Sequence, residues 1–172
     1  MRATAYRLAL AGAAVISVLA LMPRAQAEEA DKAALAAALA KVPTTLEKGL
    51  QASENTGKPV SAKFEIEDGK LQLSIYTATA AGFVEVIVAP DSGSVASSEK
   101  ITDADDLKNA TAQNAAMEKA TISLVTATER AVQQHAGSRS VSIFPELRDS
   151  EPVAAVTLLG NGQFTTVVQK LN

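Results

Sequence analysis

Residues 60–76 read VSAKFEIEDGKLQLSIY, and this stretch decides the fold. Apolar and polar residues alternate over 60–66, which is the period-two pattern of a strand with one buried face. Asp68-Gly69 follows, and this pair favours a type I′ turn because both central positions of that turn need a positive φ. The alternation resumes over 71–76. The stretch therefore predicts a β-hairpin with one apolar face.

Two helices are predicted before this hairpin. Residues 29–41 are rich in alanine, the residue with the highest helix propensity. Thr44 and Glu47 then have the spacing of a capping box, which places the start of a second helix near residue 45. Gly57 stands where a glycine at the C′ position would end that helix. The second helix can cover the apolar face of the hairpin.

A third strand and a connecting helix are predicted after the hairpin. Residues 83–89 are mostly apolar, and a turn-forming Pro90-Asp91-Ser92-Gly93 ends them. Residues 101–120 form a linker with a helix of its own, and Asp103 and Asp106 are candidates for its N-cap.

The order of elements recurs in the last third of the chain. Ser123 can cap a helix that runs to about Ala136, and Gly137 would end it. Three strand-like segments and one turn follow, at 141–143, 153–159, Gly160-Asn161-Gly162 and 164–168. This recurrence indicates two tandem units. The sequence thus predicts an α+β fold of two units, each a helix packed on a small antiparallel sheet, joined by a linker helix.

A set of short segments is shared with a known domain family. In the first half of the chain these segments are 45–57, 60–65, 67–77, 84–88 and 91–95. In the second half they are 119–124 with Ala127, Ala131 and Gly137. With them the chain resembles a tandem PepSY-domain protein. The second half departs from the pattern, since it ends at Asn172 without the Asp-x-x-Gly-x-Val type of ending found at 91–95.

The resemblance implies an extracytoplasmic, non-catalytic α+β protein. Members of the family are commonly inferred to restrain peptidases or to regulate the cell envelope. The domain organisation that follows is a signal peptide at 1–27, a first unit with the N-terminal helix at 28–100, a linker helix at 101–120 and a second unit at 121–172.

The N-terminus has the three parts of a secretory signal peptide. Arg2 and Arg7 form a basic region, residues 8–22 are an uncharged apolar run, and Ala25-Gln26-Ala27 matches the small-x-small cleavage pattern. A membrane anchor is the rival interpretation, but the run is shorter than the roughly 20 residues that a spanning helix needs. We expect cleavage before Glu28, and a soluble protein in the periplasm or outside the cell.

Composition excludes several classes of function. Loss of the three arginines in 1–27 leaves 13 of the 16 basic residues beside all 19 acidic ones, a net charge of −6. This charge argues against binding to nucleic acids and to anionic membranes. The chain has no cysteine, so disulfides and thiolate chemistry are excluded.

The residues that could carry catalysis have simpler structural interpretations. His135 is the only histidine, and it lies near the end of the predicted helix, where the helix dipole favours its protonated form. No Gly-x-Ser-x-Gly motif supplies a nucleophile for it. A hydrolase is therefore disfavoured, and no catalytic residue is predicted.

The acidic clusters and the glycine turn also favour structural roles. Asp103, Asp105 and Asp106 precede a helix without the glycine of a calcium loop, so helix capping explains them. Glu65 and Glu67 share the polar face of the predicted strand, and Asp68 belongs to the turn. Neither a glycosidase pair nor a metal or cofactor site is predicted there. Gly160-Asn161-Gly162 lacks the lysine and the following helix of a phosphate loop.

The alternation assigns side chains to the two sides of the sheet. Phe64, Phe83 and Phe164 are predicted core residues. The predicted solvent-facing set is Lys63, Glu65, Lys70, Gln72 and Ser74. If the protein binds a partner, this polar set or a strand edge would be the contact surface, because an exposed edge can accept an extended peptide.

The function predicted from these observations is binding. The leading hypothesis is a non-enzymatic exported module that restrains or modulates a peptidase or another envelope protein. The alternative is a structural or ligand- or cation-binding envelope protein. The sequence predicts no cofactor, no nucleic-acid partner and no membrane contact after cleavage, and it leaves the oligomeric state and the binding edge open.

Overall fold

The structure is a computed structural model that describes residues 24–172. Side chains are described from residue 28 onward. Most of the predicted signal peptide, residues 1–23, lies outside the described part of the chain. Within that part, no helix has the length and apolar character needed to cross a membrane.

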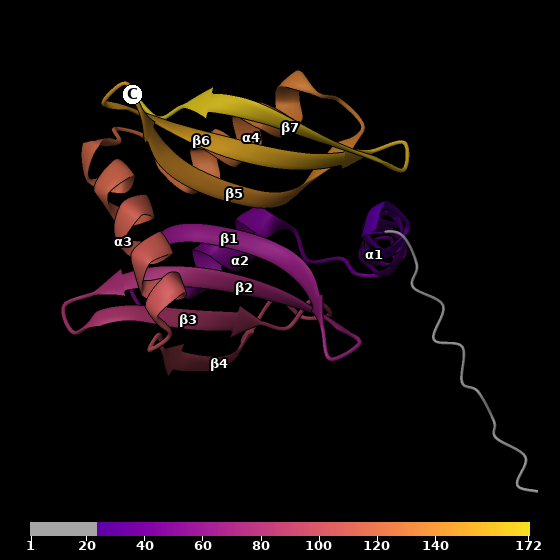
Figure 1. The fold of residues 1–172 in the computed structure, drawn as a ribbon, viewed down its shortest axis with the longest axis horizontal. Helices are drawn as coiled ribbons and strands as arrows, with labels where there is room; N and C mark the ends of the chain where they lie inside the picture. Colours follow the sequence, from indigo (N-terminus) through magenta and orange to yellow (C-terminus); the bar gives the residue numbers. More distant parts are fainter. Residues whose placement is uncertain (1–23) are drawn as a thin grey trace, which may run out of the picture.

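Residues 24–172 fold into one antiparallel sheet and four helices, so the predicted α+β class is confirmed (Figure 1). The strands are β1 (Lys58–Glu67), β2 (Lys70–Thr79), β3 (Gly82–Val88), β4 (Val95–Lys100), β5 (Ser138–Arg148), β6 (Glu151–Gly160) and β7 (Gln163–Lys170). The helices are α1 (Arg24–Leu39), α2 (Leu46–Ser53), α3 (Ala104–Lys119) and α4 (Leu124–Gln134). The seven strands lie in the order β4-β3-β2-β1-β5-β6-β7.

The prediction of two small sheets is wrong, because β1 and β5 pair and make a single seven-stranded sheet. The junction is antiparallel, with Ala62 opposite Ile143 and Lys63 opposite Ser142. An unpaired strand edge exposes a row of backbone hydrogen-bonding groups, and pairing β1 with β5 removes two such edges. Whether the halves correspond to two PepSY-like units stays a prediction.

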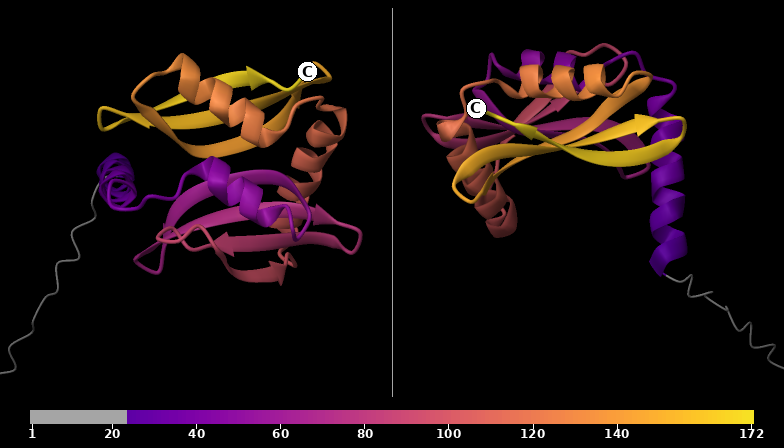
Figure 2. Two further views of the ribbon diagram at one scale, coloured as in Figure 1. Left: turned by 180° about the vertical axis from the view of Figure 1, so that it is seen from behind. Right: turned by 90° about the horizontal axis from the view of Figure 1, so that it is seen from above.

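The two sides of the sheet are covered differently. Helices α2 and α4 pack against each other on one side, which we call the two-helix face, and α3 lies on the other side, the α3 face (Figure 2). Residues directly opposite each other in neighbouring strands point to the same side. Ala62, Ile75, Val86, Ile143 and Val156 form one such row and are buried on the two-helix face.

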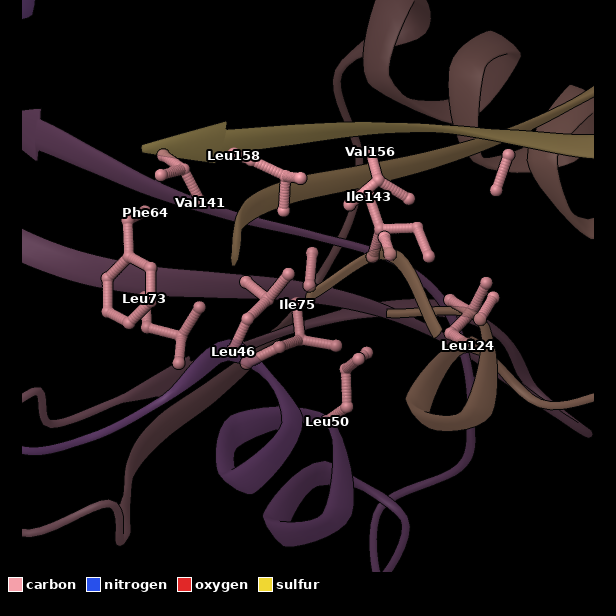
Figure 3. Close-up of a cluster of buried hydrophobic side chains, with 14 of the residues drawn as sticks. Leu46, Leu50, Phe64, Leu73, Ile75, Leu124, Val141, Ile143, Val156 and Leu158 are labelled. Atoms are coloured by element: carbon pink, nitrogen blue, oxygen red, sulfur yellow. The ribbon is translucent and has the colours of Figure 1, made fainter. Parts of the chain in front are cut away.

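The hydrophobic core draws on both halves of the chain. Leu46 from α2 and Leu124 from α4 belong to one cluster with Leu73, Ile143 and Val156 from three strands (Figure 3). Phe64 lies in the same cluster with only 3% of its surface exposed, as predicted. Because one cluster spans the β1–β5 junction, burial of apolar surface stabilises the union of the two halves.

The start and end of α2 differ from the prediction. Its N-cap is Thr45, whose hydroxyl accepts a hydrogen bond from the Lys48 amide at 3.2 Å. Thr44, the predicted cap, is buried instead. The helix ends at Ser53, and Gly57 is not its C′ residue. A Cβ at Gly57 would lie 2.5 Å from the carbonyl oxygen of Ala78, so close packing against β2 explains this glycine.

The predicted turns and the other helix caps are confirmed. Asp68 and Gly69 have φ values of 49° and 74°, as a type I′ turn requires. Asp103 caps α3 by accepting from the amides of Asp105 and Asp106, whereas Asp106 does not serve as the cap. Ser123 caps α4. Gly137, which was predicted to end this helix, has a positive φ of 83°.

Three assignments of the sequence pattern are wrong. β4 was not predicted, because its sequence VASSEK has no apolar alternation and all six residues are exposed. Phe83 is half-buried on the α3 face, since its neighbours Val84 and Val86 take the two-helix face. Ser74 has only 2% of its surface exposed, because the α3 face is covered at that point.

The other members of the predicted surface set vary in exposure. Lys70 is exposed as predicted, and Lys63, Glu65 and Gln72 are half-buried. Phe164 is also half-buried, and it packs against the edge of the core.

Candidate functional site

A polar cavity lies between α3 and the centre of the sheet, on the α3 face. Its volume is about 230 Å³. Ser61, Ser74 and Tyr76 contribute from β1 and β2, and Phe144 contributes from β5. Asp106 and Gln113 reach it from α3. We call it the α3 pocket.

Strand register explains why the floor of the α3 pocket is polar. Ser61 lies opposite Tyr76, which lies opposite Glu85 on β3, and all three point to the α3 face. The Ser74 hydroxyl donates a hydrogen bond to the Glu85 carboxylate. The polar positions of the alternating strands therefore form the floor, and α3 closes one side of it.

Burial and neighbouring carboxylates both act on the Tyr76 phenol. Burial raises the pKa of the Tyr76 phenol, and the nearby carboxylates of Asp106, Glu85 and Glu65 raise it further. Each of these charges disfavours the ionised phenolate. Tyr76 therefore stays a neutral hydroxyl at physiological pH and can act as a hydrogen-bond donor.

The α3 pocket contains an unpaired acceptor. The Oε1 atom of Gln113 is buried and has no hydrogen-bond partner. A buried polar atom without a partner is costly, and such atoms in native proteins are usually satisfied by water or a ligand. Among the described residues, one other buried side-chain atom has no partner. It is the hydroxyl of Thr44, in the segment between α1 and α2.

The sheet has two free edges, β4 and β7. In residues 24–172, no backbone hydrogen bond joins the outer edge of either strand to another segment. β4 carries Glu99 and Lys100. β7 reads QFTTVVQK and has no charge before its last residue, Lys170.

An apolar strip on the α3 face leads to the β7 edge. Phe144, Ala155 and Val168 are direct cross-strand neighbours on β5, β6 and β7. Phe144 is 38% exposed and Val168 47% exposed. The surface between the α3 pocket and β7 is thus partly apolar.

His135 lies at the end of α4, the position that the sequence predicted for it. It is the C-cap residue of α4, and its Nδ1 atom lies 3.0 Å from the carbonyl oxygen of Ala131. A hydrogen bond to that carbonyl requires the proton on Nδ1. No side-chain partner is found for the ring within the described residues.

The three aspartates of the predicted acidic cluster have different roles. Asp103 caps α3, Asp105 is exposed, and Asp106 lines the α3 pocket. In the part of the chain that the structure describes, no group of three or more histidine or acidic residues is placed to hold a metal ion.

Glu65 and Glu67 are brought together by Gln72 on β2. The Gln72 amide donates to Glu65 at 3.2 Å and also to Glu67. Glu65 forms an ion pair with Lys63 at 2.5 Å. Asp68 lies in the turn, and Asn161-Gly162 form the β6–β7 turn with positive φ values of 50° and 75°.

Sequence reasoning missed the residues of the α3 pocket. On α3, Asp106, Asn109 and Gln113 are spaced by three and four residues and all line the pocket. This spacing places them on one face of a helix. This polar stripe along one face of α3 was the signal that could have found the site.

No protein-family model matches this chain, and comparison with curated proteins and with solved structures gives no match either.

Proposed function

We propose that the protein is an exported, non-enzymatic binding module that holds an extended segment of another envelope protein along the β7 edge. The PepSY resemblance of the sequence supports the export and the regulatory role, and it suggests a peptidase as the first partner to test. The observation that carries the proposal is the uncharged free edge of β7.

The composition of the two edges distinguishes them. Natural sheets protect exposed edges against pairing with charged side chains, and lysine is the most frequent choice. β4 has this protection through Glu99 and Lys100. β7 runs through Phe164, Thr166 and Val168 with no charge until its end, and it consists largely of residues with high β-propensity. It is the better template for an incoming strand.

Site-specific photo-crosslinking tests this proposal in cells that export the protein. A photoreactive amino acid at Thr166, exposed on β7, is expected to trap one foreign envelope protein. The matched control is Ser97, exposed on β4. Equal adducts at both positions, or an adduct with a second copy of the chain, would contradict the proposal.

A substitution that places a charge on the β7 edge gives a second test of the proposal. Val168→Lys places a charge on the exposed side of β7 and should abolish the adduct at Thr166. Ser97→Lys on β4 should leave that adduct unchanged. Mass analysis of the exported protein in the same cells should give an N-terminus at Glu28, and a retained segment 1–27 would contradict the export proposal.

The alternative function, a structural or ligand- or cation-binding envelope protein, has one observation in favour of its ligand-binding form. The α3 pocket is lined by side chains of both halves and holds the unpaired acceptor of Gln113. This pocket is separated from the β7 edge by β6.

A further inference from the structure

The α3 pocket holds two side-chain groups that can accept hydrogen bonds from a ligand. Gln113 Oε1 is buried without a partner, and the Asp106 carboxylate lines the same cavity. An ionised carboxylate only accepts hydrogen bonds, and it has about four lone-pair sites. A ligand that pairs these groups must therefore supply N–H or O–H donors.

The charges around the pocket indicate whether the donor of the ligand is neutral or positively charged. Glu85 bonds Ser74 in the pocket floor and lies directly opposite Glu99 on β4. Like charges placed directly opposite in a sheet are unfavourable. Among the described residues, none of the ion pairs includes Asp106, Glu85 or Glu99.

The nearest cation does not restore the balance. Lys63 also lines the α3 pocket, but its ammonium nitrogen lies 2.5 Å from a Glu65 carboxylate oxygen. The two charges offset each other. Among the described residues, the Asp106 carboxylate in the pocket and the Glu85 carboxylate beside its floor have no ion-pair partner.

The helix dipole of α3 opposes a bound cation only weakly. The N-terminus of a helix acts as roughly half a positive charge. The first turn of α3 already carries Asp105 and Asp106, and Asp103 caps it. Of these carboxylates Asp106 alone lines the pocket, and its full negative charge exceeds the half charge of the dipole.

The walls and the volume limit the rest of the ligand. Tyr76 and Phe144 are among the residues that line the cavity, and aromatic side chains can attract organic cations. The volume of about 230 Å³ is below the roughly 300–1,000 Å³ of sites for drug-sized ligands. We propose that the α3 pocket binds a small organic cation through a primary ammonium or guanidinium group that donates to Asp106 and Gln113.

Calorimetric titration of the exported full-length protein at low salt tests this site. The probes are putrescine and N-acetyl-lysine amide, which carry the same ammonium head, and 1,4-butanediol, which has the length of putrescine without its charge. Saturable one-to-one binding of the amines and none of the diol is expected. If N-acetyl-lysine amide binds more tightly than putrescine, the natural ligand is a lysine side chain of a partner protein. If putrescine binds more tightly, the natural ligand is a free amine.

Two substitutions on one turn of α3 give the matched control. Asp106→Asn keeps the shape of the side chain, removes the charge and should weaken amine binding at least about tenfold, because a charge-assisted hydrogen bond is lost. Asp105→Asn changes the net charge equally outside the pocket and should change affinity less than about twofold, since exposed charges are screened. Gln113→Leu should also weaken binding while removing the unpaired buried acceptor.

The outcomes separate the pocket from general surface charge. Equal weakening by Asp105→Asn and Asp106→Asn would overturn the proposal, as would binding of the diol or no binding of either amine. A melting curve of each variant in the absence of ligand shows whether it is folded. The Gln113→Leu variant keeps the test decisive if Asp106→Asn unfolds.

Discussion

Phe64 and Lys63 are neighbours on β1 that point to opposite sides of the sheet. Phe64 is buried in the core, and the Arg139 guanidinium carbon lies 5.5 Å from the centre of its ring. Lys63 forms a half-exposed ion pair with Glu65. Phe64 therefore stabilises the core, whereas its neighbour Lys63 contributes little to the stability of the fold.

Substitution of these two residues tests the assignment of sides. Phe64→Ala should lower the free energy of unfolding by about 3–5 kcal/mol, because it removes a large buried side chain. Lys63→Ala should lower it by less than about 1 kcal/mol, because exposed ion pairs are weak. Denaturant melts measure both. Near-equal midpoints would show that the register of β1 is inverted.

Arg139 connects the start of β5 with the segment between α1 and α2. Its guanidinium donates to the carbonyl oxygens of Leu39 at 2.5 Å and Thr44 at 2.8 Å. Burial lowers the pKa of Arg139, and the charge of Glu47 opposes that shift. The side chain thus ties the end of α1, at Leu39, and the residue before the cap of α2, Thr44, to β5.

Loss of these bonds should destabilise the protein measurably. Arg139→Gln is expected to lower the free energy of unfolding by about 2 kcal/mol, because hydrogen bonds from a charged donor to partly buried carbonyls are lost. The control is Arg130→Gln, an exposed position on α4, which should cost less than about 0.5 kcal/mol. Equal effects of the two substitutions would show that the hydrogen bonds of Arg139 do not stabilise the protein.

At the scale of the element, the adjacent residues Thr44 and Thr45 have opposite effects on α2. The Thr45 hydroxyl caps the helix, whereas the buried Thr44 hydroxyl has no partner. Thr45→Ala should cost about 1 kcal/mol. Thr44→Val keeps the shape and removes an unpaired hydroxyl, so it should be neutral or stabilising. Thermal melts that gave Thr44→Val the larger loss would make Thr44 the cap.

Local patterns predicted most of the elements but not their partners. The alternation of 60–66 and the Asp68-Gly69 turn depend on neighbouring residues, so sequence reasoning found the β1–β2 hairpin. The pairing of Ala62 with Ile143 joins residues that are far apart in the chain, and no local period encodes it. β4 escaped detection because its two sides are both exposed and leave no apolar signal.

The candidate sites were less predictable than the fold. Asp106 was recognised only as a possible helix cap, since its approach to Tyr76 depends on how α3 crosses the sheet. The free edges depend on the order of strands in the sheet. Both features arise from tertiary packing, which the alternation of apolar residues constrains only in part.

At the scale of the whole molecule, the β1–β5 junction determines which edges are free. The ladder between these strands is short, with two residue pairs, and the core cluster beneath it contains residues from both halves. If the halves were separate sheets, β1 and β5 would be edges too. β7 would still be an edge, but β1 and β5 would be further candidate edges for a partner.

Nuclear Overhauser contacts between the backbone protons of Ala62 and Ile143 test this junction most directly. The internal control is the contact of Ala62 with Ile75, its partner within the β1–β2 hairpin. A single continuous sheet predicts cross-strand contacts from Ala62 to both residues. A contact with Ile75 and none with Ile143, in the folded full-length protein, would show two separate sheets and contradict the account.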